Sequence, residues 1–482
     1  MRKALREDGK NAAPGLRDHD GDVVRQAVLA PNGKEIFTLP QVIAQLTAAG
    51  TAWNGAPGNP TPRAGVGTIT FAFFNNANEV YSEERSEFVP LSEAQRVAVR
   101  SAFAIWGDVV GVSFVEGNVS TADINIGNID TAEDHFSAYA SYPGFGLRAG
   151  DIWISLLADT NQEIGLGEPG FRTLMHEIGH ALGLSHPGDY NAAPDVEITY
   201  AEHAEYYQDS YEYTIMSYFG SSNTGAIRNG FAATPLAHDI AALQSLYGVN
   251  PNTRTGDTVY GFNSTADRAA FDFALNANPV VAIWDSGGMD MLDFSGWSAP
   301  SRIDLRDGAM NDGGGQTSNV QIAFGTLIEN AVTGAGNDSL TGNAAANRLS
   351  AGEGEDSLRG GLGGDRLQGG GGADVFVFGA AGDSRDVAPR SDGKKGAPDR
   401  LGDFVSGVDK IDLGAIDADQ GIAGDQAFSF IGANAFSGVA GQLRAQAFGS
   451  ELHIYGDTDG DLRADFHIVA SGTQILASDF IL

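Results

Sequence analysis

The sequence contains no cysteine, and this absence excludes several kinds of chemistry. Without cysteine the chain has no disulfide bond, no thiolate ligand for zinc, no cysteine nucleophile and no latency switch that works through a cysteine. Metal binding and catalysis must therefore use other side chains.

Basic residues and long apolar runs are also scarce. The chain has 29 Lys and Arg against 62 Asp and Glu, a formal net charge of −33. This charge makes nucleic acids and anionic membranes unfavourable partners and favours cations. No run of 18 apolar residues occurs, so we expect no membrane span. Residues 1–22 include basic side chains but no apolar stretch, and therefore do not form an ordinary secretory signal peptide.

The length of 482 residues predicts two or more domains. Residues 1–20 are polar and are typical of a leader or a short pro-segment, or equally of a plain flexible terminus. After Gly248 the helical periodicity disappears, and Gly, Asp and Asn become frequent. We therefore place a boundary near residue 250, with one domain over 21–250 and a second over 251–482.

Hydrophobic patterning predicts the elements of the first domain. Ser92 is expected to cap a helix over 92–110, and Thr234 another over 234–247 with Pro235 at its first position. A shorter helix is expected over 38–49, before a turn over 51–57. The expected strands are Thr68–Phe74, Val112–Glu116, Asp123–Gly127 and Asp151–Leu156. This order predicts an α+β domain with a mixed sheet.

The most specific pattern is H-E-x-x-H-x-x-G-x-x-H, which runs from His176 to His186. His176 and His180 project from one helical face and can reach one metal, and Glu177 lies beside the coordination sphere. Gly183 is placed to end the helix in a left-handed turn that brings in His186 as a third ligand. Three nitrogens leave one position open for a water, so the pattern predicts a catalytic zinc.

Neither chance packing nor a dinucleotide site fits this region as well as zinc. A helix whose histidines pack by chance is disfavoured because five positions are specified rather than three. Gly165, Gly167 and Gly170 form a G-x-G-x-x-G sequence, which could indicate a dinucleotide site. Pro169 lies inside it and no strand–helix–strand unit surrounds it, so we reject that interpretation.

The sequence TIMSYF over 214–219 places Met216 30 residues after His186. Alone, a methionine among aromatic residues is usually ordinary core. Together the two motifs resemble the metzincin metalloproteases, in which a methionine turn forms an apolar floor under the zinc.

Residues 333–377 are five consecutive repeats of nine residues. Each is expected to form a Gly-rich turn, whose carbonyls and aspartate hold calcium, followed by a short strand with one inward apolar side chain. A Gly-rich linker would not keep Asp and Leu in register. Position six holds Asp338, Asn347, Asp356, Asp365 and Asp374, and position eight holds Leu340, Leu349, Leu358, Leu367 and Phe376. The expected turn glycines are Gly334, Gly336, Gly352, Gly354, Gly361, Gly363, Gly370 and Gly372.

Coils on one side should be two repeats apart, and calcium between them would cancel carboxylate repulsion. Asp338 should then share an ion with the turn at 351–356, and Asp356 with the turn at 369–374. Asp365 would pair with the second repeat, which lacks the glycines and the aspartate, so an ion there is in doubt.

Most of the chain resembles the serralysin family, through TAWNG at 51, HEIGHALGLSHPGDYNA at 176, TRTGDTVYGFNS at 253 and VDKIDL at 408. The resemblance implies a secreted zinc endopeptidase of the metzincin clan. Its fold would be an α+β protease domain followed by an all-β parallel β-roll of calcium-binding RTX repeats.

The resemblance also implies roles for individual residues. His176, His180 and His186 are the expected zinc ligands and Glu177 the general base. Tyr218 would be a further zinc ligand that swings aside and hydrogen-bonds the oxyanion. The stretch 138–142 resembles an edge strand on which an extended substrate pairs, which implies broad specificity.

Further calcium ligands are implied ahead of the repeats. Leu327 stands where relatives often carry threonine, so a side-chain ligand is lost there. Asp399, Asp403 and Asp409 are candidates for one more ion. The loop of Asp457, Asp459 and Asp461 resembles an EF-hand, but Leu462 and Ile468 break that pattern. The expected ligands are Arg254, Gly256, Thr258, Asp285, Gly287, Gly288, Asp290 and Glu329.

The chain ends with Asp479 and three apolar residues, Phe480 to Leu482. This resembles the uncleaved signal of type I bacterial export, although an ordinary last strand is the alternative. Extracellular modules bind calcium at roughly 0.1 to 1 mM, so the roll should fold only outside the cell. The expected partners are protein or peptide substrates and the exporter, with an inhibitor protein as a further candidate, and we expect a monomer.

Two rival functions remain. One is a calcium-dependent adhesin or binding module with an inactive protease domain, although every catalytic position is intact. The other is an esterase or lipase with the same roll, which the absence of G-x-S-x-G disfavours.

Overall fold

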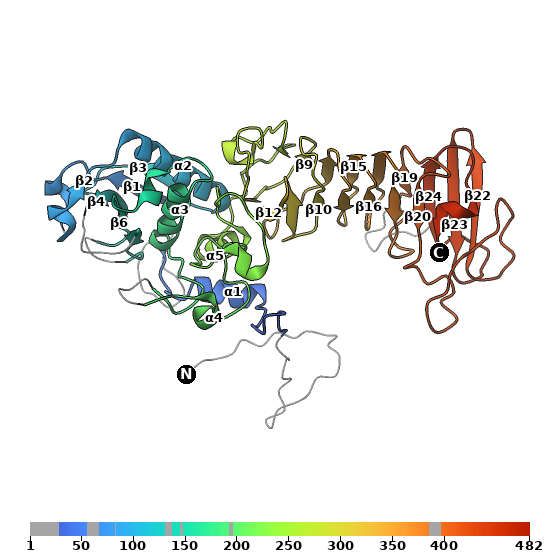
Figure 1. The fold of residues 1–482 in the computed structure, drawn as a ribbon, viewed down its shortest axis with the longest axis horizontal. Helices are drawn as coiled ribbons and strands as arrows, with labels where there is room; N and C mark the ends of the chain where they lie inside the picture. The colour runs from blue at the N-terminus through green and yellow to red at the C-terminus, as the bar shows by residue number, and fades with distance from the viewer. Residues whose placement is uncertain are drawn as a thin grey trace, which may run out of the picture.

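The computed structural model describes residues 28–54, 67–81, 83–130, 137–144, 148–191, 196–384 and 397–482. The leader expected over 1–20 and part of the turn expected over 51–57 lie outside these ranges. The molecule is elongated, with the helices gathered in its N-terminal half and a long stack of strands leading to the C-terminus at the far end (Figure 1).

The N-terminal half is built on a six-stranded sheet in the order β3-β1-β4-β6-β5, with β2 paired to β4. Strands β1, β3, β4 and β6 are parallel, whereas β5 runs antiparallel to β6 at the edge. The mixed sheet and the four predicted strands are confirmed. The bounds of the six strands are β1 Thr68–Phe73, β2 Phe88–Val89, β3 Ser113–Glu116, β4 Ile124–Ile129, β5 Ala138–Ala140 and β6 Ile152–Ser155.

Helices α2 and α3 pack on each other beside this sheet (Figure 1). Ser92 caps α2 as predicted, because its hydroxyl accepts from the Gln95 amide at 3.3 Å and the Gln95 side chain accepts from the Ser92 amide at 2.9 Å. Trp106 of α2 is fully buried and donates to the carbonyl of Met175 in α3. The α-helices are α1 Leu39–Leu46, α2 Glu93–Val109, α3 Pro169–Ala181, α4 Tyr200–His203 and α5 Ala237–Tyr247.

The start of α5 differs from the prediction. Its cap is Leu236, not Thr234, and Pro235 precedes the helix instead of opening it. The Thr234 hydroxyl is occupied elsewhere: it donates to the Pro235 carbonyl and accepts from the amide of Ala282 at 2.8 Å. The Asp239 carboxylate satisfies the Leu236 amide instead, at 2.9 Å.

The C-terminal half winds through two sheets of short, mostly parallel strands. One has nine strands in the order β25-β20-β18-β16-β14-β10-β11-β12-β8, and the other has ten in the order β21-β22-β23-β24-β19-β17-β15-β13-β9-β7. The bounds are β7 Val259–Gly261, β8 Val281–Ile283, β9 Met291–Phe294, β10 Arg302–Asp304, β11 Met310–Gly313, β12 Gln316–Ile322, β13 Asn330–Thr333, β14 Ser339–Thr341, β15 Arg348–Glu353, β16 Ser357–Arg359, β17 Arg366–Gly371, β18 Val375–Val377, β19 Asp399–Leu401, β20 Lys410–Asp412, β21 Ser429–Phe430, β22 Gln442–Phe448, β23 Glu451–Asp457, β24 Phe466–Ser471 and β25 Phe480–Ile481.

The repeats alternate between the two sheets, as their period predicts. Leu340 pairs with Leu358 in one sheet, and Leu349 pairs with Leu367 in the other. All five position-eight side chains are at most 1% exposed. Each coil therefore takes two repeats, and the predicted inward position forms the core.

Two apolar cores lie along the molecule, one largely before residue 250 and one largely after it. Trp284 and Val280 from the C-terminal half pack into the first core. Arg254 also crosses between the halves and pairs with Asp108 at 3.0 Å. The halves are thus joined by apolar packing and by an ion pair.

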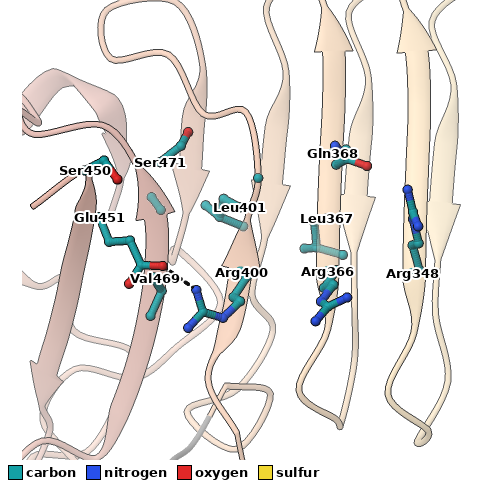
Figure 2. Close-up of a pocket in the computed structure, with 12 residues that line it drawn as sticks. Arg348, Arg366, Leu367, Gln368, Arg400, Leu401, Ser450, Glu451, Val469 and Ser471 are labelled. Atoms are coloured by element: carbon teal, nitrogen blue, oxygen red, sulfur yellow. Dashed lines mark hydrogen bonds and ion pairs between the residues drawn. The ribbon is translucent and has the colours of Figure 1, made fainter.

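Position seven of the repeats points outward, and on the ten-stranded sheet it carries arginine. Arg348, Arg366 and Arg400 stand in register on neighbouring strands, and Arg400 pairs with Glu451 at 2.7 Å (Figure 2). These side chains line a surface pocket of about 450 Å³. Among the described residues no helix is long and apolar enough to cross a membrane.

The remaining short elements are 3-10 helices. They are η1 Ala77–Glu79, η2 Glu83–Ser86, η3 Asp159–Gln162, η4 Ser221–Thr224, η5 Ala269–Phe271 and η6 Ala477–Asp479.

Candidate metal centre

Helix α3 carries His176 and His180, and a tight turn after it returns the chain to them. Gly183 has φ +110°, and a Cβ there would lie 2.3 Å from the carbonyl oxygen of Thr51. Only glycine fits this left-handed position without strain. The left-handed turn predicted at Gly183 is therefore present, and it redirects the chain toward His186.

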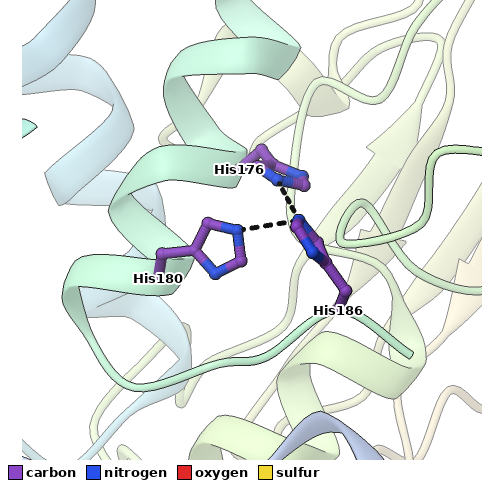
Figure 3. Close-up of side chains that lie close together, drawn as sticks. All are labelled: His176, His180 and His186. Atoms are coloured by element: carbon purple, nitrogen blue, oxygen red, sulfur yellow. Dashed lines mark hydrogen bonds between the residues drawn. The ribbon is translucent and has the colours of Figure 1, made fainter. Parts of the chain in front are cut away.

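The three imidazoles converge on one point (Figure 3). The Nε2 atom of His186 lies 3.0 Å from Nε2 of His180 and 3.3 Å from Nε2 of His176. All three side chains offer one nitrogen within 4.8 Å of the others. The structure therefore brings together the three residues that the motif singled out.

The other ring nitrogens fix the tautomers. Nδ1 of His176 lies 2.8 Å from the carbonyl of Ile215, Nδ1 of His180 lies 2.7 Å from that of Leu184, and Nδ1 of His186 lies 2.9 Å from that of Tyr190. A carbonyl only accepts, so each Nδ1 must carry the proton. The Nε2 lone pairs then face one another without a hydrogen between them.

Such an arrangement repels itself unless a cation lies among the lone pairs. Three neutral imidazoles, each oriented by a carbonyl on its far nitrogen, fit a zinc ion and leave its fourth position open. Burial lowers the pKa of His180 to about 3 and that of His186 to about 4, and it lowers the pKa of His176 as well. The rings are therefore neutral at pH 7, as metal ligands must be.

Glu177 lies next to His176 on the same helix and is only 5% exposed. Its Oε2 atom has no hydrogen-bond donor among the described residues. Burial raises the pKa of this carboxyl to about 8, against a smaller lowering by the charge of Arg172. A carboxyl in this state is suited to take and return a proton near neutral pH.

Met216 is fully buried against α3. A Cβ at Gly179, which lies between the two helical histidines, would meet the Met216 sulfur at 2.7 Å. The sulfur thus packs directly under the turn of helix that carries His176 and His180, where the sequence predicted an apolar floor.

Asp239 was not singled out from the sequence, yet it holds this floor in place. Its carboxylate accepts from the Thr214 hydroxyl at 2.5 Å and from the amide of Ile215 at 2.9 Å. Ile215 is the residue whose carbonyl orients His176. The only signal for Asp239 was an acidic residue near the start of a predicted helix, which also occurs at ordinary helix starts.

Tyr190 was also missed, and it acts on His186 in two ways. Its carbonyl accepts from Nδ1, and its ring stacks on the imidazole at 5.4 Å between centroids and 12° between planes. The Tyr190 hydroxyl donates to the buried carboxylate of Asp209 at 2.9 Å, and the Ser217 hydroxyl donates to the same oxygen at 2.7 Å. Asp209 therefore ties the loop after His186 to the methionine turn.

Tyr218 and the edge strand complete the surroundings of the triad. The Tyr218 ring lies 4.5 Å from that of His186 and 6.0 Å from that of His176, centroid to centroid. Strand β5 forms the edge of the sheet beside α3, and Tyr142 just beyond it contacts His180 edge-on at 5.6 Å. The predicted ligand and the predicted edge strand both lie next to the centre.

The acidic residues expected to hold calcium ahead of the repeats also gather. The Thr258 amide donates to Asp290 at 2.8 Å, and the Asp290 amide donates to Glu329 at 2.8 Å. Burial, together with the charges of Asp285 and Glu329, raises the pKa of Asp290 to about 7. A Cβ at Gly288 would lie 2.6 Å from the Gly256 carbonyl.

One carboxylate oxygen of this group, Oδ2 of Asp290, is buried and lacks a donor among the described residues. Clustered carboxylates and close carbonyls are the donor set that calcium prefers. Arg254, by contrast, directs its side chain away, toward Asp108, Asp267 and the carbonyl of Trp284. Of Arg254, only the backbone oxygen is therefore left to bind an ion at this group.

In the repeats, glycines lie directly over the carbonyls of the preceding coil. A Cβ at Gly352 or Gly354 would lie 2.0 Å from the oxygen of Gly334 or Gly336. The equivalent distances are 2.8 Å for Gly361, 2.5 Å for Gly363, 1.8 Å for Gly370 and 1.6 Å for Gly372. Any side chain at these glycines would collide with the carbonyl oxygens of the preceding coil. It would push the coils apart and would fill the space between the oxygens.

The aspartates of the repeats form a ladder from coil to coil. Oδ1 of Asp356 accepts from the Asp338 amide at 2.7 Å, and Oδ1 of Asp374 accepts from the Asp356 amide at 3.0 Å. Oδ1 of Asp365 accepts from the Asn347 amide at 2.7 Å. Oδ2 of Asp338 and of Asp356 is buried without a donor among the described residues. Such buried, negatively charged oxygens need a cation nearby.

The second repeat is built differently. Nδ2 of Asn347 donates to the Glu329 carbonyl at 2.9 Å, and Nδ2 of Asn343 donates to the carbonyls of Leu305 and Ile328. Side-chain amides of this turn thus bond carbonyls of residues that precede the repeats. This is consistent with the absence of turn glycines and of the aspartate from this repeat, which put an ion there in doubt.

The ladder continues past the repeats through Asp399 and Asp409. Oδ1 of Asp399 accepts from the Asp365 amide at 2.9 Å, and Oδ1 of Asp409 accepts from the Asp374 amide at 3.1 Å. Asp403 accepts from the amides of Gly369 and Gly370. Asp399 lies 34 residues after Asp365 and Asp409 lies 35 residues after Asp374, whereas bonded aspartates within the repeats lie 18 residues apart. A search for a fixed period therefore does not find this continuation.

Near the C-terminus the structure gathers Asp457, Asp459 and Asp465 within 4.8 Å. Asp461, which belongs to the EF-hand-like pattern, is not part of this group. The carboxylate of Asp457 already accepts from the amides of Gly460 and Leu462, and that of Asp465 accepts from Thr458.

Comparison with known proteins agrees with this geometry. The family profile "Peptidase M10 serralysin C terminal" matches residues 249–482. Metalloprotease AprA of Pseudomonas entomophila is 39% identical over 99% of this chain and 97% of its own length. Metallopeptidase AprA of Pseudomonas marginalis is 41% identical over 94% and 93%. Serralysin C of Dickeya chrysanthemi is 39% identical over 94% and 92%.

These similarities define the class of the protein as a zinc metalloendopeptidase. Within that class, the chain belongs to the serralysin family of metalloproteases.

Proposed function

We propose that this protein is a secreted endopeptidase of broad specificity, in which His176, His180 and His186 bind one catalytic zinc ion. The observation that carries the proposal is the convergence of three deprotonated Nε2 atoms, with each Nδ1 held by a carbonyl. Because burial keeps all three rings neutral at pH 7, no proton lies between these nitrogens to link them, whereas a metal ion can bind all three.

When bound, zinc supplies a Lewis acid that polarises the scissile carbonyl and acidifies a water. Glu177 accepts the proton of the attacking water on its carboxylate and then delivers it to the amine that leaves. Its burial supports this role, because a carboxyl with a raised pKa can exchange a proton near neutral pH. The Tyr218 hydroxyl donates to the oxyanion that forms on the former carbonyl.

The substrate binds as an extended strand along β5. This strand lies at the edge of the sheet, so its outer backbone groups are available to pair with a peptide. Pairing through the backbone depends little on side chains, which accounts for a broad preference.

Calcium stabilises the second half. We assign it to the group of Asp285, Asp290 and Glu329 and to the turns of the first, third, fourth and fifth repeats. Support comes from the buried carboxylate oxygens without donors among the described residues and from the carbonyls that the turn glycines leave uncovered.

The protease domain, of the metzincin type, spans 21–250 and the β-roll 251–482. The C-terminal residues act as a type I export signal while the chain is unfolded. In the folded molecule β25 pairs with β20, and Asp479 accepts from the amides of Gly407 and Leu476. A signal hidden in this way can be read only before calcium folds the roll.

The test is hydrolysis of casein and of a simple ester by the same purified protein, before and after treatment with 1,10-phenanthroline. We expect casein cleavage that the chelator removes and that zinc restores in the presence of calcium. Ester hydrolysis without casein cleavage would indicate a lipase. A folded, zinc-loaded protein with neither activity would indicate the binding module.

A further inference from the structure

A cavity of about 640 Å³ opens beside the candidate metal centre. Its wall includes Arg172, Tyr211, Ser221, Ile215, Arg228 and Phe231. Two of these residues belong to the surroundings of the triad. Arg172 lies on α3, four residues before His176, and Ile215 provides the carbonyl that orients His176.

Arg172 is held in this wall by aromatic rings. Its guanidinium carbon lies 4.3 Å from the centre of the Tyr211 ring and 5.5 Å from that of the Phe231 ring. Such contacts fix the planar group without neutralising its charge. The side chain is a positioned cation rather than a flexible surface arginine.

No acidic side chain among the described residues forms an ion pair with Arg172. Its Nε atom is buried and has no hydrogen-bond acceptor among them. That nitrogen is enclosed, but the side chain as a whole is partly exposed and lines the cavity. A carboxylate that enters the cavity can therefore pair with the guanidinium.

A second guanidinium strengthens the positive potential of the cavity. Both terminal nitrogens of Arg228 donate to backbone carbonyls, those of Tyr211, Glu212 and Ser318, while its Nε is buried without an acceptor among the described residues. It therefore contributes charge and holds Tyr211 in place, while Arg172 remains available. Two arginines in one wall are notable in a chain with a net charge of −33.

Arg172 and His176 share one face of α3, because four residues correspond to about one helical turn, roughly 6 Å along the axis. A peptide whose scissile carbonyl lies at the metal centre can place a neighbouring side chain in this cavity. We propose that Arg172 is a specificity-determining residue that binds the carboxylate of an Asp or Glu next to the scissile bond. This inference rests on the proposed peptidase function.

The test uses the zinc- and calcium-loaded full-length protein. Cleavage of a mixed peptide library identifies whether Asp and Glu are enriched at one position beside the cut. Two peptides that differ only by Glu or Gln at that position then give a ratio of kcat/KM. A charge-assisted, bidentate pair predicts a ratio of about 10 or more for the wild-type protein.

Arg172→Gln should bring this ratio to about 1, and Arg172→Lys should retain part of it, because lysine keeps the charge but not the planar fork. Arg366→Gln is the control, since Arg366 is exposed on β17 of the roll, does not line this cavity and should leave the ratio unchanged. Zinc content and circular dichroism establish that each variant is folded.

Two results would overturn the inference. The first is a wild-type ratio of 1 or less, which needs no variant and so does not depend on the folding of any mutant. The second is an equal loss of kcat/KM for both peptides in Arg172→Gln, which would mean that Arg172 supports Glu177 or the fold. A wild-type protein that cleaves no peptide would instead contradict the proposed function itself.

Discussion

At the scale of single residues, the candidate metal centre depends on backbone carbonyls as much as on histidines. The carbonyls of Ile215, Leu184 and Tyr190 each accept from an Nδ1 atom and so direct an Nε2 lone pair inward. Orientation before binding reduces the entropy that metal binding must overcome.

Glu177→Gln tests the proposed proton transfer. The amide keeps the shape of the side chain but cannot take a proton, so we expect kcat on casein to fall by about 10²- to 10⁴-fold while zinc stays bound. Metal analysis and peptide kinetics on the same sample measure both quantities. Glu163→Gln, at an exposed position before α3, is the control and should retain full activity. Undiminished turnover of Glu177→Gln would remove this residue from the mechanism.

Asp239→Asn tests the support under the triad. The change replaces one acceptor oxygen by an amide donor, so the turn that carries Ile215 should loosen and His176 should lose its orientation. We expect zinc affinity to fall by about 10- to 100-fold, measured by competition with a chromophoric chelator. Asp159→Asn, an exposed aspartate in η3, is the control. An unchanged affinity in Asp239→Asn would contradict the role.

The sequence allowed the three histidines, Glu177 and Met216 to be predicted because their spacing along one helix and one turn is local. Asp239 and Tyr190 could not be predicted. Asp239 acts through the amide of Ile215, 24 residues before it, and Tyr190 acts through its own carbonyl, four residues after His186. A motif records side chains, whereas these supports act through amides and carbonyls.

At the scale of elements, the β-roll is a stack in which each short strand gives one apolar side chain to the core. Leu358 is fully buried, so Leu358→Ala should cost about 2 to 5 kcal/mol of unfolding free energy in calcium. Leu362 lies in the next repeat and is 52% exposed, so Leu362→Ala should change stability by less than about 0.5 kcal/mol. Denaturant unfolding measures both, and equal effects would contradict the assigned inward face.

The same elements predict how stability depends on pH without calcium. Burial raises the pKa of Asp356 from 3.8 to about 6, and burial with neighbouring charges raises that of Asp290 to about 7. The folded state then binds protons more tightly than the unfolded chain. The protonated carboxyls of Asp356 and Asp290 therefore stabilise the folded state fully below about pH 4, and this stabilisation is lost as the pH rises through about 6 to 7.

Calorimetry of the calcium-free protein should therefore give a midpoint for the roll that is roughly 5 °C lower at about pH 8 than at about pH 5. With calcium at about 10 mM the midpoint should instead be higher at about pH 8 than at about pH 5, because the ionised carboxylates become calcium ligands. A midpoint that rises with pH in the absence of calcium would contradict the burial of these groups.

Most elements were predictable because their signals are periodic, as in the helix that Ser92 caps and the strands of the repeats. The start of α5 was not, because the Thr234 hydroxyl bonds the amide of Ala282 in the other half of the molecule. The sequence marked Asp399 only as a candidate ligand and not as a rung of the ladder, since the loop between coils breaks the period.

At the scale of the whole molecule, the half with the candidate metal centre and the half with the β-roll share an interface. Trp284 packs into the first core, and Arg254 bonds both Asp108 of the first half and the Trp284 carbonyl of the second. The net charge of −33 disfavours a compact state, and bound calcium would offset it. Composition indicated this need for cations, but not the contacts that join the halves.

The most direct test of the account is a titration of metal-free, calcium-loaded protein with zinc, in which bound zinc and casein hydrolysis are measured in the same samples. The three converging imidazoles predict that activity rises in proportion to bound zinc and stops rising at one equivalent. His186→Gln should abolish the high-affinity step and the activity together. Full hydrolysis in the metal-free protein, or none in folded protein with one zinc bound, would contradict a catalytic zinc at this centre.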